Sequence, residues 1–179
     1  MTAVQTETRI PTGTWAVDPV HSKIGFAVKH LGVSWFRGSF GQVEGALDES
    51  GLVGTADVTS VAVDEPNLKG HLLSPDFFDA ERHPQLTFRS NDVRVDGDAV
   101  AIDGEITIKG VSRPLSLSGT IGGPVENPYG KVVIGLDVKG TVDRREFGLD
   151  WNAPLPGGGL TVANEVTITG ELELVQADA

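Results

Sequence analysis

The stretch V-A-I-D-G-E-I-T-I-K (Val100–Lys109) decides the fold class, because apolar and polar residues alternate along it. Branched aliphatic residues occupy positions 100, 102, 106 and 108, while Asp103, Glu105 and Lys109 have the opposite parity. Successive side chains of a β-strand point to opposite faces, so a period of two gives one apolar and one polar face. The stretch therefore predicts a strand that is buried on one side and solvated on the other.

The same alternation extends along most of the chain on both sides of this stretch. It recurs at Ile24–Val28, Leu115–Ile121, Val132–Val142 and Leu160–Leu174, with turn signals such as Asp96-Gly97 between runs. We expect about seven to nine strands, and an antiparallel sheet of that size either splits into a sandwich or closes into a barrel. Long runs and glycines inside strands favour an all-β fold, an extended antiparallel barrel of about eight strands.

Some glycines occupy positions of the apolar parity, where a packed core would favour Val or Leu. They are Gly104, Gly119, Gly140 and Gly170. One interpretation is that they relieve crowding where the barrel bends. The other is that they leave volume for a lengthwise tunnel, lined by Ile, Val, Leu and Phe, that an aliphatic or isoprenoid chain fills. Both interpretations stay open at this point.

One segment interrupts the alternation: N-L-K-G-H-L-L-S-P-D-F-F-D-A-E-R-H-P (Asn67–Pro84). Leu68 and Leu72 lie four residues apart, as on one face of a helix. Ser74-Pro75-Asp76 is typical of a helix start, because Ser caps, Pro fits the first turn and Asp favours the positive helix end. The final proline stops the helical region. We expect a short helical insert around residues 67–83 that covers an apolar surface.

Composition argues against several classes of partner. The chain of 179 residues has a formal net charge of −11, which argues against nucleic acid or an anionic membrane surface. Cysteine is absent, so disulfides and thiolate chemistry are excluded. No run approaches about 18 apolar residues, and the first ten residues lack the apolar core of a signal peptide. We expect a cytoplasmic protein without stable membrane insertion, with a flexible N-terminal segment at 1–12 and a single domain at 13–176.

Motifs for catalysis are missing from the chain, so no catalytic residue is expected. There is no G-x-S-x-G, no phosphate-binding glycine loop and no H-E-x-x-H. The histidines, at positions 21, 30, 71 and 83, lack the spacing of a zinc site, and no metal is expected. Arg144, Arg145 and Asp150 are expected to form a solvated or structural ion pair in a loop.

Six blocks that run through nearly the whole chain form a specific pattern. They are W-A-V-D-P-V-H-S-K-I-G-F-A-V-K-H-L (Trp15–Leu31), G-S-F-G-Q-V-E-G (Gly38–Gly45), H-L-L-S-P-D-F-F-D (His71–Asp79), H-P-Q-L-T-F-R-S (His83–Ser90), I-T-I-K-G-V-S-R-P-L (Ile106–Leu115) and R-R-E-F-G-L (Arg144–Leu149). In this order they resemble the YceI-like, or polyisoprenoid-binding, family. Each block is unspecific alone, whereas the set is highly specific.

The resemblance implies a bacterial protein with an extended, lipocalin-like barrel around a long lipid chain. Its function would be non-catalytic binding or carriage of a polyisoprenoid, an isoprenoid quinone or a similar lipid, with that lipid as ligand and no separate cofactor. Relatives are often dimers, so a homodimer stays open. Many relatives carry a signal peptide that this sequence lacks, which argues against an export-linked role. The alternatives are a lipid-modifying enzyme that uses the same tunnel, and a packed-barrel structural or interaction module.

The expected ligand-binding residues lie on the apolar parity of the strands and in the insert, which the resemblance places beside the barrel mouth. For each of them the alternative is an ordinary core position. His71 and His83 are interpreted as head-group hydrogen bonders or structural polar residues. The expected set is Phe26, Val28, Phe36, Phe40, His71, Leu72, Phe77, Phe78, Leu86, Phe88, Ile102, Ile106, Leu117, Ile134, Leu136, Val166 and Ile168.

Overall fold

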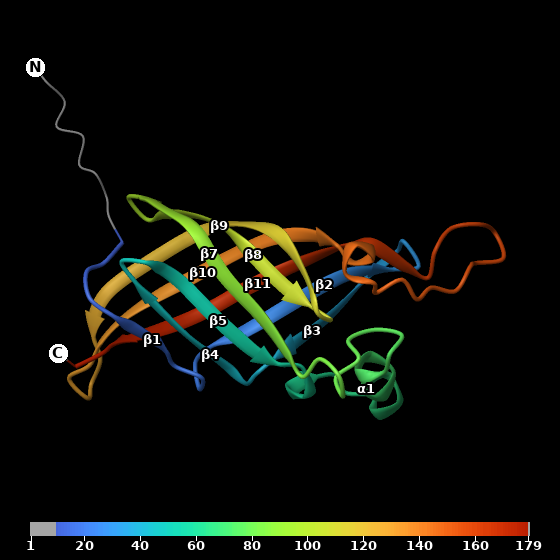
Figure 1. Cartoon of the computed structure of the whole chain (residues 1–179), viewed down its shortest axis with the longest axis horizontal. Coiled ribbons are helices and arrows are strands. Elements are labelled where there is room, and N and C mark those ends of the chain that lie inside the picture. Colours follow the sequence, from blue (N-terminus) through green and yellow to red (C-terminus); the bar gives the residue numbers. More distant parts are fainter. Residues whose placement is uncertain (1–9, 179) are drawn as a thin grey trace, which may run out of the picture.

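The chain folds into a closed eight-stranded antiparallel barrel in the computed structural model, which describes residues 10–178 (Figure 1). The pairing order is β1-β4-β5-β7-β8-β9-β10-β11, and the ring closes where Trp15 on β1 pairs with Gln176 on β11. This confirms the expected barrel. The strands are β1 (Trp15–Val17), β2 (Lys23–His30), β3 (Ser34–Phe40), β4 (Val43–Asp48), β5 (Gly51–Asp57), β6 (Val61–Ala62), β7 (Gln85–Asp96), β8 (Ala99–Ile108), β9 (Val111–Glu126), β10 (Val132–Asp143) and β11 (Val162–Gln176).

The strand β11 changes its neighbour along its length, which makes the two ends of the barrel different. Its C-terminal residues pair with β1, whereas its N-terminal part pairs with β2, as at Gly170 and Ile24. β2 then pairs with β3 and β3 with β6, where the sheet order ends. In residues 10–178 no pairing joins β6 to β7, and the connection between them contains α1 (Pro66–Leu73). The helical insert therefore lies beside the unpaired edge of the barrel wall (Figure 1).

The insert contains the expected short helix, but the predicted start at Ser74 is wrong. The helix begins at Pro66, and the carboxylate of Glu65 caps it by accepting a hydrogen bond from the backbone N–H of Asn67. Ser74 instead ends the helix, and its hydroxyl donates to the carbonyl oxygen of His71 at 2.6 Å. Glu65-Pro66 and Ser74-Pro75 both place a side chain with an acceptor oxygen before a proline, which suits a helix start. The helix begins at the first of the two.

Most of the inward glycines relieve crowding and leave no empty volume. A Cβ at Gly119 would overlap the carbonyl oxygen of Asp137 on the neighbouring β10, and a Cβ at Gly104 or Gly140 would also lie too close to a backbone carbonyl oxygen, though by less. At Gly170 a Cβ would meet Val138 Cγ2 at 3.3 Å, so some room remains there. The tunnel interpretation is therefore wrong for Gly104, Gly119 and Gly140. At these positions the backbone of the neighbouring strand lies too close to leave room for a side chain.

The end of the barrel that β1 closes is filled by side chains. Trp15, Leu47 and Leu174 are at most 2% exposed there, and Trp15 pairs with Leu47 across β1 and β4. A core that is packed at one end leaves the other end, beside β2, β3 and α1, for the larger internal cavity.

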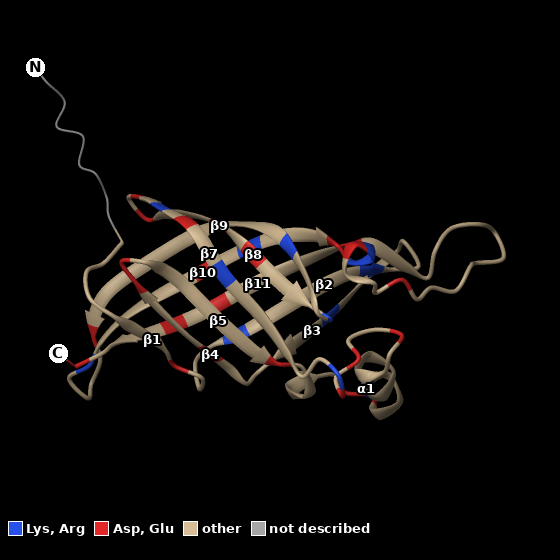
Figure 2. Ribbon diagram, in the orientation of Figure 1, with Lys and Arg blue, Asp and Glu red and all other residues tan. Residues whose placement is uncertain are grey.

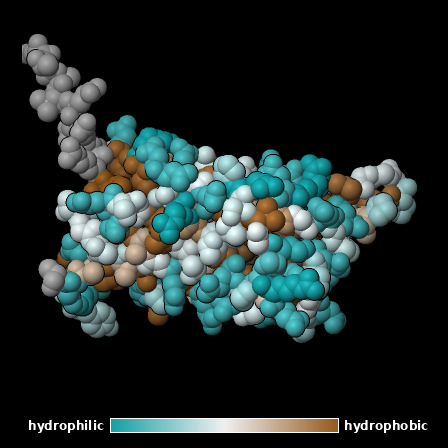
Figure 3. Space-filling model, viewed as in Figure 1, coloured by the Kyte–Doolittle hydropathy of each residue, from teal (hydrophilic) through white to brown (hydrophobic). Residues whose placement is uncertain are grey.

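The outer surface of the barrel is polar. Figure 2 shows acidic and basic residues scattered along the strands, and Figure 3 shows a mostly hydrophilic face with hydrophobic residues in patches. No helix in residues 10–178 has the length and hydropathy needed to cross a membrane. Of the expected flexible segment 1–12, residues 1–9 lie outside the described part of the chain.

Candidate functional site

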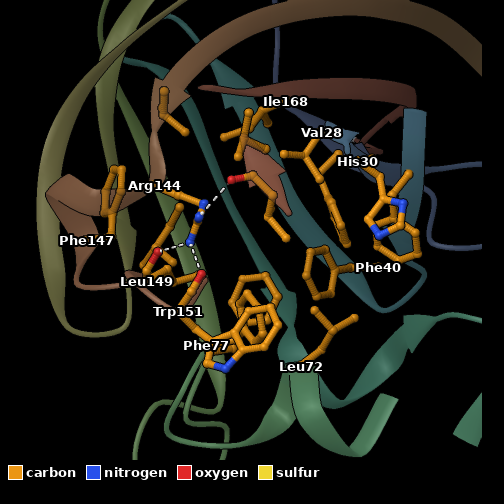
Figure 4. Close-up of a pocket in the computed structure, with 18 of the residues that line it drawn as sticks. Val28, His30, Phe40, Leu72, Phe77, Arg144, Phe147, Leu149, Trp151 and Ile168 are labelled. Atoms are coloured by element: carbon orange, nitrogen blue, oxygen red, sulfur yellow. Dashed lines mark hydrogen bonds between the residues drawn. The ribbon is translucent and has the colours of Figure 1, made fainter. Parts of the chain in front are cut away.

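A cavity of about 540 Å³ lies inside the open end of the barrel (Figure 4). Its size is within the usual range for sites that enclose a small organic ligand. Its walls come from β2 and β3, from the insert, from parts of β7, β8 and β10, from the segment after β10 and from the first half of β11. The lining residues are Ile24, Gly25, Phe26, Val28, His30, Ser34, Trp35, Phe36, Phe40, Leu68, His71, Leu72, Phe77, Phe78, Leu86, Ile106, Ile108, Val142, Arg144, Phe147, Leu149, Trp151, Thr161, Val162, Val166 and Ile168.

Phenylalanine rings from the two sides of the opening meet in one cluster. Phe40 of β3 lies 5.7 Å from Phe26 of β2 and 5.5 Å, edge to face, from Phe78 of the insert, measured between ring centroids. Phe26 faces Gly38 across the strand pair, and its ring occupies the space that a side chain there would need. The cluster packs the insert against the barrel and gives the cavity a stiff apolar wall.

A second ring cluster joins the insert to the segment that follows β10. The imidazole of His71 lies edge-on to Phe77 at 4.9 Å and to Trp151 at 4.7 Å. His71 Nε2 lies 3.1 Å from a carboxylate oxygen of Asp76, which orients the ring. In Figure 4 the rings of Trp151 and Phe77 lie together below the cavity. These side chains therefore close the cavity on the side of the insert.

Lys109 holds the same two segments together. Its ammonium group donates to the carbonyl oxygen of Pro75 in the insert at 2.6 Å and to that of Gly148 at 3.2 Å. One side chain at the β8–β9 turn thereby holds the insert (the cover of the cavity) and the segment after β10 (its rim) in place.

Arg144 is a buried cation in the cavity wall, only 5% exposed. In the described part of the chain no carboxylate lies within ion-pair distance of it, so the expectation that it is solvated or ion-paired is wrong. Burial lowers the pKa of its guanidinium. The guanidinium instead donates to backbone carbonyls on both sides of a loop (Figure 4), namely those of Leu149, Trp151, Val162 and Ala163. It thus fixes the path of residues 149–163 along the cavity.

Arg145, by contrast, forms a surface ion pair of the expected kind, although its partner is Asp143 and not the expected Asp150. Its guanidinium lies 2.6 Å from a carboxylate oxygen of Asp143, and that carboxylate also accepts from the backbone N–H of Arg145. The hydrogen bonds from Arg145 lower the pKa of Asp143 to about 2. The pair caps the single turn η2 (Arg144–Phe147), which carries Arg144 and Phe147 into the wall.

A smaller cavity of about 90 Å³ lies deeper in the barrel. It shares Ile24, Leu86, Ile106 and Ile168 with the larger cavity, so the two adjoin. Beyond these four residues, Val17, Phe88, Leu115, Leu117, Val138 and Leu172 are among its apolar lining residues. Glu44, Thr55, Thr87 and Thr169 border it too, but the surface presented to the cavity is almost wholly apolar. The interior therefore narrows from the open end toward the packed end.

Most of the sequence-predicted site residues lie around these two cavities. Phe88 and Leu117 line only the deeper one, and Ile102, Ile134 and Leu136 line neither and belong to the packed core. The predicted residues in the larger cavity are Phe26, Val28, Phe36, Phe40, His71, Leu72, Phe77, Phe78, Leu86, Ile106, Val166 and Ile168. The structure places these side chains together, and ligand contact by each of them stays a prediction.

Sequence reasoning missed much of the wall contributed by the segment after β10 and by the β2–β3 hairpin. Phe147, Leu149 and Trp151 lie in a region that breaks the period of two, so parity gave no signal there. The R-R-E-F-G-L block (Arg144–Leu149) was a signal that includes Phe147 and Leu149 but not Trp151. The other lining residues that were not predicted are Ile24, Gly25, His30, Ser34, Trp35, Leu68, Ile108, Val142, Arg144, Thr161 and Val162.

One group of metal-ligand type occurs on the outer surface, away from the cavity. In the described residues Asp18, His21 and Glu173 place ligand atoms within 4.8 Å of one another. His21 Nδ1 is hydrogen-bonded to Asp18 at 2.8 Å, and this bond raises the pKa of His21 and lowers that of Asp18. The contacts account for the group as an exposed ion pair at the turn between β1 and β2.

Comparison with known proteins identifies the relatives of this chain. A family model for the YceI-like domain matches residues 15–174. A UPF0312 protein of Pectobacterium atrosepticum is 35% identical over 136 residues, which cover 72% of this chain and 71% of that protein. Protein YceI of Escherichia coli O157:H7 is 32% identical over 136 residues, with 72% of this chain and 71% of that protein covered.

Solved structures share the barrel. The YCEI protein of Campylobacter jejuni superposes with a TM-score of 0.72 at 23% identity, covering 99% of this chain and 98% of that one. A polyisoprenoid binding domain from Saccharophagus degradans, implicated in plant cell wall breakdown, superposes with a TM-score of 0.68 at 14% identity, covering 91% and 98%. At these identities the likeness establishes the fold alone.

Proposed function

The chain belongs to the YceI-like family, and we propose that it binds and carries a long apolar lipid, such as a polyisoprenoid or an isoprenoid quinone, without catalysing a reaction on it. The observation that carries this proposal is the apolar cavity of about 540 Å³ inside the open end of the barrel. The polyisoprenoid binding described for the Saccharophagus degradans domain supports the same ligand class.

The physical basis of binding is removal of hydrocarbon from water. Each Å² of apolar ligand surface that enters the cavity contributes roughly 25 cal/mol, so a chain that buries about 400 Å² gains roughly 10 kcal/mol before the costs of immobilisation. Few polar groups face the ligand, so discrimination between an isoprenoid, a quinone tail and a fatty chain would be weak. The polar or charged lining side chains are those of His30, Ser34, His71, Arg144 and Thr161.

The distribution of these polar side chains gives the ligand a direction. All five border the larger cavity and none borders the deeper one. Glu44, Thr55, Thr87 and Thr169 also border the deeper cavity, but the surface presented to that cavity is almost wholly apolar. An unpaired head group would lose hydrogen bonds to water if it entered the deeper part. We therefore infer that the hydrocarbon tail lies past Ile168 and that the head group stays near the hairpin of His30 and Ser34.

The proposal is tested by extracting the natively purified protein with organic solvent and identifying the extract by mass spectrometry. One lipid chain per protein, of isoprenoid or quinone type, is the expected result. An extract that stays empty after incubation of the protein with polyprenols and quinones would overturn the carrier function and favour an interaction module. Recovery of a lipid that the protein has chemically altered would favour the alternative of a lipid-modifying enzyme.

Other expectations from the sequence stay predictions. The cytoplasmic location is tested by cell fractionation, and the absence of nucleic-acid binding by a shift assay. A homodimer is tested by sedimentation velocity of the purified chain.

A further inference from the structure

Apolar side chains are exposed together at the open end of the barrel. Val33 and Trp35, in the β2–β3 hairpin, are 79% and 49% exposed, and Leu31 and Leu160 beside them are exposed as well. The hairpin and the loop that carries Leu160 are adjacent, because the backbone N–H of Leu31 donates to the carbonyl oxygen of Thr161 at 2.8 Å. Figure 3 shows apolar atoms on the loop that projects at the right. We call residues 29–37 and 151–162 the tip.

The tip differs in charge from the rest of the protein. It holds Lys29 and Arg37 but no Asp or Glu, although the chain as a whole has a formal net charge of −11. Lys29 Nζ lies 4.8 Å and the guanidinium carbon of Arg37 lies 5.7 Å from the centroid of the Trp35 ring. In Figure 2 the projecting loop is free of the colours that mark charged residues, while acidic residues are scattered over the barrel. The tip is thus a small cationic and apolar surface on an acidic protein.

We propose that the tip docks on the surface of a phospholipid bilayer that contains anionic lipids. Exposed aliphatic side chains enter the head-group region, Trp is favoured at that depth, and Lys and Arg pair with anionic head groups. Screening limits charge interactions to about 8 Å at physiological ionic strength, so the local charge of the tip decides contact and the acidic body does not. This revises the expectation that the net charge of the whole chain argues against an anionic membrane surface as partner.

The position of the cavity fits this docking. His30, Ser34, Trp35 and Thr161 belong to the tip and also line the larger cavity. A bilayer held against the tip therefore faces the cavity through the side where we place the lipid head group, and a lipid would move between them over a short aqueous distance. A second copy of the chain fits the tip less well, because a two-fold contact would bring Lys29 and Arg37 near the same residues of the other copy.

The proposal is tested by co-sedimentation of the purified protein with vesicles. One set of vesicles is phosphatidylcholine alone, and the other also contains phosphatidylglycerol. We expect sedimentation with the phosphatidylglycerol vesicles, and weaker sedimentation at high salt or with phosphatidylcholine alone. The double variant Val33→Asp/Leu160→Asp should bind at least about tenfold more weakly, since two charges would enter the head-group region. Neither residue lines a cavity.

Two further variants control the experiment. Tyr129→Asp changes an exposed apolar residue at the opposite end of the barrel and should bind vesicles like the unaltered protein. Lys29→Glu/Arg37→Glu should lose the preference for phosphatidylglycerol and lower vesicle affinity at least about fivefold. The readout is vesicle binding, so it stays separate from lipid content, which tests the proposed function.

Three results would overturn the proposal. They are absence of the unaltered protein from the vesicle pellet, equal sedimentation of the Val33→Asp/Leu160→Asp variant, and a dimer in sedimentation velocity that only this variant abolishes. The last result would assign the tip to a second copy of the chain.

Discussion

The imidazole of His71 meets the indole of Trp151 edge to face, with ring centroids 4.7 Å apart and ring planes at 87°. His71 belongs to α1, and Trp151 to the segment after β10, so the contact joins two parts of the chain that are eighty residues apart. Both side chains line the cavity. The contact therefore closes the proposed lipid site between the insert and the segment after β10.

Removing the closure should speed lipid release. An aromatic pair contributes about 0.5–1.5 kcal/mol beyond its buried area, so His71→Ala should raise the off-rate of a fluorescent polyprenol or quinone analogue by about 2- to 12-fold. His71→Phe keeps a ring in place and should stay near the original rate. Stopped-flow competition measures the rate, with Tyr129→Ala at the opposite end as control. An unchanged rate in His71→Ala would contradict the role of the contact.

Arg144 should be a large contributor to stability. Arg144→Met leaves buried carbonyls of the 149–163 segment without donors, and we expect a loss of about 3 kcal/mol in the free energy of unfolding. Arg145→Met removes a neighbouring but exposed guanidinium and should cost much less, because solvent screens an exposed ion pair. Denaturant unfolding of the two variants under identical conditions measures the difference. Equal losses would mean that the carbonyl contacts do not stabilise the fold.

Gly119 and Gly122 lie on the same strand and provide a matched test of strand curvature. A Cβ at Gly119 would overlap the carbonyl oxygen of Asp137, whereas a Cβ at Gly122 meets nothing within 4 Å. We expect Gly119→Ala to destabilise the barrel by about 1–3 kcal/mol or more, and Gly122→Ala to change stability by less than about 0.5 kcal/mol. Thermal unfolding compares them. A stable Gly119→Ala variant that has lost only lipid binding would restore the tunnel interpretation of this glycine.

The barrel could be predicted from sequence because its signal is local and repeated. The alternation at Val100–Ile108 reports one buried and one solvated face, and it matches β8 (Ala99–Ile108) almost to the residue. Residues of that parity near the open end, such as Ile106 and Ile168, line the cavity, and their contact with a ligand stays a prediction. The parity of a residue shows which face of its strand it occupies but not how far along the barrel it lies. Ile102 and Ile134 were therefore predicted to bind the ligand, although they lie in the packed core of the barrel.

The remaining errors concern contacts between distant segments. In the sequence Arg144 resembles an ordinary surface charge. Its acceptors include the backbone carbonyl oxygens of Val162 and Ala163 at the start of β11. Every residue has such a carbonyl, so residue types do not reveal this contact. The inward glycines were ambiguous for the same reason. Whether Gly119 leaves a space depends on how closely β10 approaches it, and that distance is set by the curvature of the barrel.

The pKa of Asp143 provides a pH-dependent test of the turn that carries Arg144. Hydrogen bonds from Arg145 lower this pKa from 3.8 to about 2, so the folded state favours the charged carboxylate. The stabilisation from this pair is therefore complete above pH 3.8 and is lost as the pH falls through about 2. Carboxyl NMR titration should give this low value, and Arg145→Gln should move it back toward 3.8. The pKa of Asp48, which is lowered by Ser50, should not move in that variant.

Ile168 lies where the larger cavity meets the deeper one, and its size should set the length of chain that the protein accepts. Ile168→Phe places a ring at this junction, so the tail of a long polyprenol could no longer pass it. We expect the variant to keep short isoprenoids at near-original affinity and to lose about tenfold or more for long ones, as roughly 50–60 Å² or more of apolar burial is forfeited. Titration of a polyprenol length series measures this, with Ile134→Phe as control. Ile134 lines neither cavity, so that variant should lose stability by overpacking but keep the original length preference. If Ile168→Phe instead weakens all lengths equally, the tail does not reach the deeper cavity, and the inferred direction of the ligand is wrong.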